Sequence, residues 1–194
     1  GFYAQIDPTD NVTVYAESQF GVIYRVNVKT WDRSSIRPPQ SDRDGPRDRY
    51  NWNSPILLSQ HNPQVIYFGG NKLFKSYNRG DEWIVISPDL TTANEEKIKG
   101  NVPHCTITSI AESTFDPRVL LVGTDDGNVQ WTTDGGATWT NHADNFPGLP
   151  KNWWVSRVEL SAHDRNTAYV SFTGYREDDF RPFVYKTTDG GKMW

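Results

Sequence analysis

The chain has 194 residues, with 20 Lys and Arg against 24 Asp and Glu, so its net charge is −4. Charges of both signs are interspersed, which leaves no basic stripe for a phosphate backbone, and no apolar run approaches a membrane span. We therefore expect neither nucleic-acid binding nor direct membrane insertion. Cys105 is the one cysteine, which excludes an internal disulfide, and 13% aromatic residues favour sheets over Leu-rich helices.

Taken in chain order, the sequence repeats a pair of short apolar strands joined by a turn that is rich in Pro, Asp and Asn. Apolar and polar residues alternate with the period of two that indicates strands, and no window predicts a helix. The paired strands are expected at 2–6 and 12–15, at 54–60 and 65–68, at 106–112 and 119–122, and at 155–161 and 168–172.

Three of these units continue into a shared turn motif, Ser/Thr-x-Asp/Asn-x-Gly-x-x-Trp, with a period of about 55 residues. A carboxylate or amide at the third position accepts hydrogen bonds from following backbone N–H groups, and Gly permits a positive φ. We expect structural turns, in which each Trp begins a fourth strand and packs on its own or a neighbouring sheet. The first unit has only Lys29-Thr30-Trp31 at this place, so its motif is degenerate or absent. The motif residues are Ser76, Asn78, Gly80 and Trp83, then Thr132, Asp134, Gly136 and Trp139, then Thr187, Asp189, Gly191 and Trp194.

These motifs resemble the Asp-box, or bacterial neuraminidase repeat, of β-propeller proteins such as sialidases, sortilin-type receptors and xyloglucan-cleaving enzymes. The segments Asp125-Asp126-Gly127-Asn128-Val129 and Asn51-Trp52-Asn53-Ser54-Pro55 are similar to large bacterial proteins described as sortilin-like or glycosyl-hydrolase-like. The resemblance implies an all-β fold, a partial β-propeller of about four consecutive four-stranded antiparallel blades with the last one truncated. It implies one domain over 1–194, with approximate blades at 1–40, 50–90, 104–145 and 153–194.

The resemblance also implies an extracytoplasmic protein, periplasmic or secreted, whose partners include the remaining blades of a longer parent chain. The long connections at 32–50, 87–103, 141–152 and 174–181 are expected at the end of the sheets opposite the motif turns. Residues at the start of each first strand should lie nearest the axis of the propeller. They include rings and cations suited to stacking on a sugar or clamping a carboxylate. These candidate ligand-binding residues are Tyr50, Trp52, His104, Trp153, Trp154 and Arg157.

The alternative interpretation is that Trp52 and one of Trp153 and Trp154 fill the core between blades. The loop 174–181 adds three more candidates, Asp178, Asp179 and Arg181. Adjacent carboxylates could supply an acid and a base for glycoside hydrolysis, but such a pair normally comes from separate blades. Salt bridges of these carboxylates with Arg176 and Arg181 are therefore favoured.

No metal or cofactor site is expected. Cys105 is interpreted as a buried, inert thiol, and Asp125-Asp126-Gly127 as a hairpin turn. The four histidines have no metal-ligand spacing: His61, His104, His142 and His163.

Two functions remain open from the sequence. The first is a non-catalytic recognition or scaffold propeller of sortilin-like type, which binds a protein, peptide or glycan on the long-loop face. The alternative is a glycoside hydrolase, sialidase- or xyloglucanase-like, with catalytic carboxylates shared with further blades and none assigned here. A photosystem-assembly-like factor is consistent with the same repeats. Two carboxylates across the long-loop face, one with a perturbed pKa, would favour the enzyme.

Overall fold

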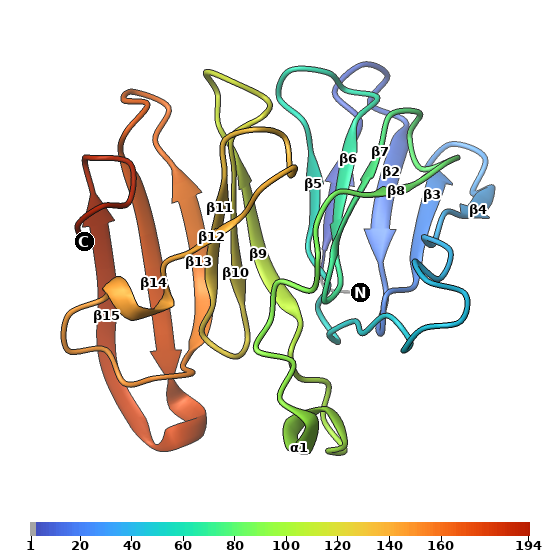
Figure 1. Cartoon of the computed structure of the whole chain (residues 1–194). Coiled ribbons are helices and arrows are strands. Elements are labelled where there is room, and N and C mark those ends of the chain that lie inside the picture. Colours follow the sequence, from blue (N-terminus) through green and yellow to red (C-terminus); the bar gives the residue numbers. More distant parts are fainter. Residues whose placement is uncertain (1–2) are drawn as a thin grey trace.

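The computed structural model describes residues 3–194 and contains four antiparallel sheets that follow one another along the chain (Figure 1). In each sheet, strands that are neighbours in space are neighbours in sequence, as in consecutive propeller blades. The expected all-β, partial propeller is confirmed, and the fourth sheet has three strands. Phe2, expected in the first strand, lies outside the described residues. The strands are β1 (Ala4–Ile6), β2 (Thr13–Glu17), β3 (Ile23–Asn27) and β4 (Arg33–Ser35); β5 (Ile56–Leu58), β6 (Ile66–Gly69), β7 (Leu73–Ser76) and β8 (Ile84–Val85); β9 (Ile107–Glu112), β10 (Leu120–Thr124), β11 (Val129–Thr132) and β12 (Thr140–Asn141); and β13 (Trp154–Leu160), β14 (Ala168–Gly174) and β15 (Asp179–Thr187).

The hydrophobic core lies between the sheets, in three clusters that each join one sheet to the next. Every residue of β9 and β10 is buried, because the third sheet is covered on both faces. In contrast, exposed and half-buried side chains alternate along β15. The largest buried side chains are Tyr15, Phe68 and Phe74 in the first cluster, Tyr67, Leu73 and Ile107 in the second, and Trp131, Phe146 and Phe172 in the third.

The motif turn of the third sheet shows how these turns are built. The Thr132 hydroxyl donates to Asp134 Oδ1 at 2.8 Å and accepts from the Gly136 N–H at 3.0 Å. Asp134 Oδ1 also accepts from the Thr138 N–H at 2.9 Å. The first two of these bonds recur at Ser76, Asn78 and Gly80 and at Thr187, Asp189 and Gly191.

The tryptophan of each motif contacts the preceding sheet. Trp83 Nε1 donates to the carbonyl of Ile36 at 2.8 Å, and Trp139 Nε1 donates to the carbonyl of Ile86 at 3.2 Å. Trp194 packs against rings of the third sheet. The sequence left open whether these rings pack on their own or a neighbouring sheet, and the structure shows the neighbouring one.

The first sheet makes its third turn differently. Asn27 Oδ1 accepts from the N–H groups of Lys29 and Thr30 at 2.9 and 3.1 Å. The side chain of Trp31 is exposed and does not dock on a sheet. The first unit therefore lacks the motif, in agreement with its sequence.

Three short helical turns lie in the loops: α1 (Glu95–Ile98) and the 3₁₀ turns η1 (Ala143–Asn145) and η2 (Tyr175–Glu177). The prediction of no helix was wrong at α1. A single turn is too short to show a hydrophobic period, and it forms because the Asn94 side chain accepts from the Lys97 N–H at 3.0 Å. Within residues 3–194, no helix has the length and apolar character needed to span a membrane.

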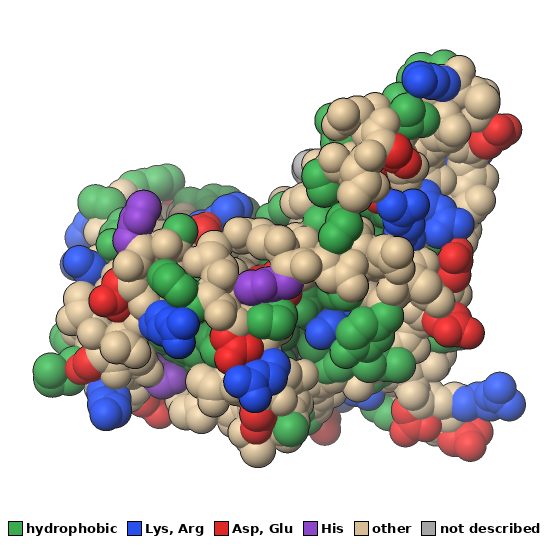
Figure 2. Space-filling model, turned by 90° about the horizontal axis from the view of Figure 1, so that it is seen from above, with side chains coloured by type: hydrophobic (Ala, Val, Ile, Leu, Met, Phe, Trp, Pro, Cys, Tyr) green, Lys and Arg blue, Asp and Glu red, His purple; other side chains and the backbone are tan. Residues whose placement is uncertain are grey.

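The two ends of the sheets differ (Figure 1). The turns from first to second strands and the motif turns lie at one end, uppermost in the figure, which we call the box end. The β10–β11 and β14–β15 turns and α1 lie at the other, which we call the loop end. Figure 2 looks at the box end and shows acidic and basic side chains intermingled over an outline that is concave on one side.

Candidate functional site

A cavity of about 290 Å³ lies at the loop end, where the third and fourth sheets meet, and we call it the loop-end cavity. It combines buried carboxylates with aromatic rings and cations, which is the composition of a ligand site on a rigid scaffold. Its lining includes His104, Asp125, Asp126, Trp153, Trp154, Arg176 and Glu177.

Asp125 is the most constrained carboxylate of the cavity, with 2% of the residue exposed. Its Oδ1 accepts from the Thr106 N–H at 2.9 Å, and its Oδ2 accepts from the Thr106 hydroxyl at 2.6 Å and the Asn51 amide at 3.0 Å. Burial raises the pKa of Asp125 to about 6, although the bonds from Thr106 act in the opposite direction. Because Asn51 precedes the second sheet, Asp125 also links the third sheet to the second.

Asp126 is held from two other directions. Its Oδ2 accepts from the N–H and the hydroxyl of Thr92 at 2.8 and 2.7 Å. Its Oδ1 accepts from the Thr124 hydroxyl at 2.5 Å. These bonds fix the orientation of the carboxylate and fasten the connection 87–103 to the β10–β11 turn.

His104 and Cys105 lie beside these carboxylates. His104 Nδ1 is 3.9 Å from Asp125 Oδ1 and 3.5 Å from Cys105 Sγ, and burial lowers the pKa of this imidazole. Cys105 is fully buried, as expected, and burial raises the pKa of its thiol to about 11, with the charge of Asp126 acting in the same direction. The sequence predicted no metal site, but donor atoms of His104, Cys105 and Asp126 all lie within 4.8 Å of one another.

Trp154 and Trp153 have different roles in the cavity. The Arg176 guanidinium lies 4.5 Å from the centroid of the half-buried Trp154 ring. Trp153 is buried and packs edge-on against Phe183, with ring centroids 5.1 Å apart. A Cβ at Gly174 would lie 2.5 Å from the Trp153 ring, so that ring is confined. Trp153 therefore fills core, and Trp154 offers its ring to the cavity.

Three other sequence candidates lie outside the lining of this cavity. Tyr50 is buried in the core between the first and second sheets, stacked on Phe68 with centroids 5.7 Å apart. Trp52 is exposed and contacts the edge of Phe20. Arg157 is exposed and pairs with a carboxylate of its own strand.

The charged loop 174–181 contributes through residues that the sequence did not select. Asp179 pairs with Arg181 at 2.5 Å at the surface, which agrees with the salt-bridge interpretation. Arg176 instead donates to the Tyr175 hydroxyl at 2.8 Å, and within residues 3–194 no ion pair joins it to Asp178. Asp178, Asp179 and Arg181 are not in the lining of the cavity, whereas Arg176 and Glu177 are.

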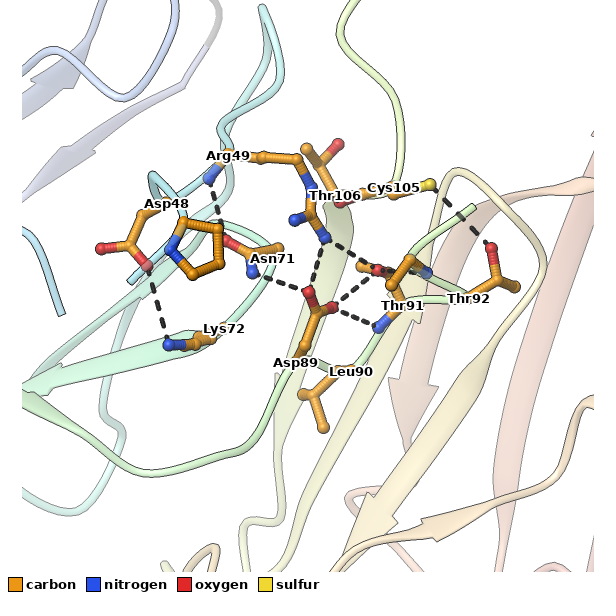
Figure 3. A network of polar contacts seen from close by, with 12 residues as sticks. Asp48, Arg49, Asn71, Lys72, Asp89, Leu90, Thr91, Thr92, Cys105 and Thr106 are labelled. Carbon is orange, nitrogen blue, oxygen red and sulfur yellow. Dashed lines mark hydrogen bonds and ion pairs between the residues drawn. The ribbon is translucent and has the colours of Figure 1, made fainter. Parts of the chain in front are cut away.

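Arg49 anchors the connection 87–103 beside the cavity (Figure 3). Its Nη2 donates to Asp89 at 2.6 Å and to the Thr91 hydroxyl at 3.1 Å, and its Nε donates to the Cys105 carbonyl at 3.3 Å. Burial raises the pKa of Asp89, but hydrogen bonds from Thr91, Asn71 and Arg49 outweigh burial and hold it below its usual value. The network fixes the backbone on which Thr92 and Cys105 lie.

Asp125 and Asp126 are the residues that sequence reasoning missed. They do form part of a turn, since the Gly127 N–H donates to the Thr124 carbonyl at 3.4 Å. A signal was present: in a meander blade, the turn between the second and third strands lies at the same end as the start of the first strand. Two consecutive carboxylates there had to lie near the residues that begin the neighbouring strands.

A larger cavity of about 390 Å³ lies at the box end, around Trp131 and His142. Its one carboxylate, Asp116, is committed to Arg118, with which it pairs at 2.8 Å. We therefore place the functional site at the loop end, where the carboxylates are buried and held by bonds from several segments.

No protein-family model matches the sequence, and no curated protein matches it either. Three solved structures are similar over nearly the whole chain. They are a GH74 xyloglucanase from Xanthomonas campestris (TM-score 0.66, 17% identity, 98% of this chain), an ancestral GH74 enzyme (0.61, 18%, 99%) and a protein of unknown function from Bacteroides thetaiotaomicron (0.60, 13%, 98%).

The chain spans only 29%, 23% and 41% of the lengths of these three structures. At such low identity the likeness concerns the fold alone. It agrees with the four sheets described above, and the chain therefore has the architecture of part of a β-propeller.

Proposed function

We propose that the chain is part of a glycan-binding β-propeller and that the loop-end cavity holds a sugar unit. One observation carries the proposal: a half-buried indole, Trp154, lines the same cavity as the fixed carboxylates of Asp125 and Asp126. Aromatic rings stack on the apolar faces of sugars, and ionised carboxylates accept hydrogen bonds from hydroxyl groups. Two of the similar structures are described as GH74 enzymes, one of them a xyloglucanase, which supports a glycan as the ligand class.

The test is binding of a glycan array, followed by calorimetry with xyloglucan oligosaccharides, to the full-length protein. Replacing Trp154 by Ala should abolish binding, because the ring that stacks on the sugar is lost. Trp52→Ala is the matched control, since Trp52 is an exposed indole outside the cavity. Equal binding by the two variants, or binding of no glycan by the unmodified protein, would contradict the proposal.

Glycoside hydrolysis is the second candidate, and a specific feature favours it. Asp125 from the third sheet and Glu177 from the fourth line one cavity, and hydrolysis requires carboxylates on two sides of the bond that breaks. A panel of chromogenic glycosides tests this function. Turnover that both Asp125→Asn and Glu177→Gln abolish would establish an enzyme, and binding without turnover would leave a recognition propeller.

Three finer points from the sequence belong to the same proposal. The three motif turns are Asp-box repeats, the four sheets are consecutive blades of one domain, and further blades of a parent chain complete the ring. The protein works outside the cytoplasm, where polymeric glycans are accessible. None of the three similar structures is described as a sortilin-like receptor, so we favour a glycan over a protein or peptide ligand.

A further inference from the structure

The wall of the loop-end cavity brings together three side chains that commonly bind metal ions. Donor atoms of His104, Cys105 and Asp126 all lie within 4.8 Å of one another, and Cys105 Sγ is 3.5 Å from His104 Nδ1. Zinc binds sulfur at about 2.3 Å and imidazole nitrogen at about 2.0 Å, so its tetrahedral ligands of these types lie about 3.5 Å apart. The thiol and the imidazole therefore already have the separation that a zinc ion requires.

The backbone explains why two consecutive residues can serve one site. Consecutive side chains of an extended segment point to opposite sides. Cys105, however, has a φ of 58°, in the left-handed region that residues other than Gly seldom adopt. This conformation breaks the alternation, so that His104 and Cys105 face the same space.

The third donor is held in place by its own hydrogen bonds. Asp126 accepts from Thr92 and from Thr124, and such bonds to a ligating carboxylate are the usual outer shell of a metal site. The Thr92 hydroxyl also lies 3.9 Å from Cys105 Sγ, on the segment that Arg49 anchors (Figure 3). Asp125, beside His104, adds negative charge that attracts a cation.

We propose that His104, Cys105 and Asp126 bind a zinc ion, with the fourth coordination position open to the loop-end cavity. A thiolate with an imidazole and a carboxylate suits zinc, whereas magnesium and calcium require oxygen ligands. On binding, the Cys105 S–H bond breaks, the sulfur bonds to the metal and the proton leaves to solvent. Three protein ligands and one open position are the arrangement of zinc sites that act on a bound molecule. This site does not depend on the glycan proposal, and its test contains no sugar.

The test uses the full-length protein after removal of metals with a chelator. Zinc content is measured after dialysis against zinc, and cobalt(II) is titrated in as a spectroscopic probe. We expect about one metal ion at this site, visible-region bands of tetrahedral cobalt and a thiolate-to-cobalt charge-transfer band. Because Cys105 is the one cysteine of the 194 residues, Cys105→Ser reports on the thiolate of this segment directly.

Cys105→Ser should remove the charge-transfer band, and His104→Gln should weaken zinc binding by more than the about 10- to 100-fold that changes in an outer shell cause. His163→Gln is the matched control, because His163 is exposed and far from the cluster in sequence. Circular dichroism shows whether each variant is folded. A folded Cys105→Ser protein that keeps the band, or equal zinc affinity in His104→Gln and His163→Gln, would overturn the proposal, as would an unmodified protein that binds no zinc.

Discussion

The indole Nε1 of Trp139 donates a hydrogen bond to the carbonyl oxygen of Ile86 at 3.2 Å, across the boundary between the third and second sheets. Trp83 and Ile36 repeat the contact one sheet earlier, at 2.8 Å. The motif turn therefore closes a hairpin within its own sheet and also fastens that sheet to the one before it. Four predictions follow from this arrangement and from the anchoring of the loop end.

Replacing Trp139 should destabilise the protein in two separable steps. Trp139→Ala removes the half-buried ring and should lower the free energy of unfolding by about 3 kcal/mol. Trp139→Phe keeps most of the ring but loses the bond to Ile86, so it should cost about 1 kcal/mol. Urea denaturation measures both values. If the two variants lose equal stability, the ring itself contributes nothing to the contact between sheets.

Gly136 should be the least replaceable glycine of its turn. It has a φ of 99°, and a Cβ at this position would lie 2.2 Å from the Ile86 carbonyl oxygen. Gly136→Ala should therefore lower the free energy of unfolding by more than the about 1 kcal/mol that a positive φ alone costs. Gly135→Ala is the control, because Gly135 has a φ of 77° but its Cβ would meet no atom closer than 3.9 Å. Equal losses in the two variants would show that the neighbouring sheet yields without cost.

Asp134 should make the third sheet sensitive to acid. Hydrogen bonds from the Thr138 side chain and backbone lower the pKa of Asp134 to about 2 from 3.8. Because the folded-state pKa is the lower one, the stabilisation is complete above pH 3.8 and is lost as the pH falls through about 2. Asp134→Asn should therefore flatten the decline of the melting temperature over this interval.

Asn78 provides a comparison for Asp134 within the same chain. It occupies the equivalent place in the second sheet, where its Oδ1 accepts from the Glu82 N–H at 2.9 Å. Asn78→Ala should lower the melting temperature by a similar amount at every pH, because an amide does not titrate. An acid profile that Asp134→Asn leaves unchanged would show that the decline comes from other carboxylates.

Arg49 should control the order of the connection 87–103. Arg49→Lys removes the planar fork that contacts Asp89 and Thr91, and it should cost about 1 to 2 kcal/mol of stability. Cleavage by trypsin after Lys97 should become faster, because the segment opens more often. Arg157→Lys is the control, since an exposed ion pair contributes less than about 1 kcal/mol. Unchanged cleavage in Arg49→Lys would place the anchor elsewhere.

Much of the fold could be predicted from local sequence signals. The strands around residues 56, 107 and 155 came from alternation, and the three motif turns came from their shared spacing. The one-turn helix at 95–98 escaped because it is shorter than any hydrophobic period, and it depends on the Asn94 cap. Trp52 and Trp154 could not be separated by sequence either, since exposed and cavity-lining rings at the start of a strand look the same.

The sequence by itself determined the four sheets, the places of the turns and the end at which the long connections gather. These features depend on residues close together in the chain, through alternation and hydrogen bonds within a turn. The tertiary structure decided which residues form a site. Asp126 meets His104 and Cys105 only because β9 and β10 pair antiparallel, which returns the β10–β11 turn to the start of β9. That proximity comes from the register of paired strands and from a left-handed Cys105, and neither is encoded in the spacing of the three residues.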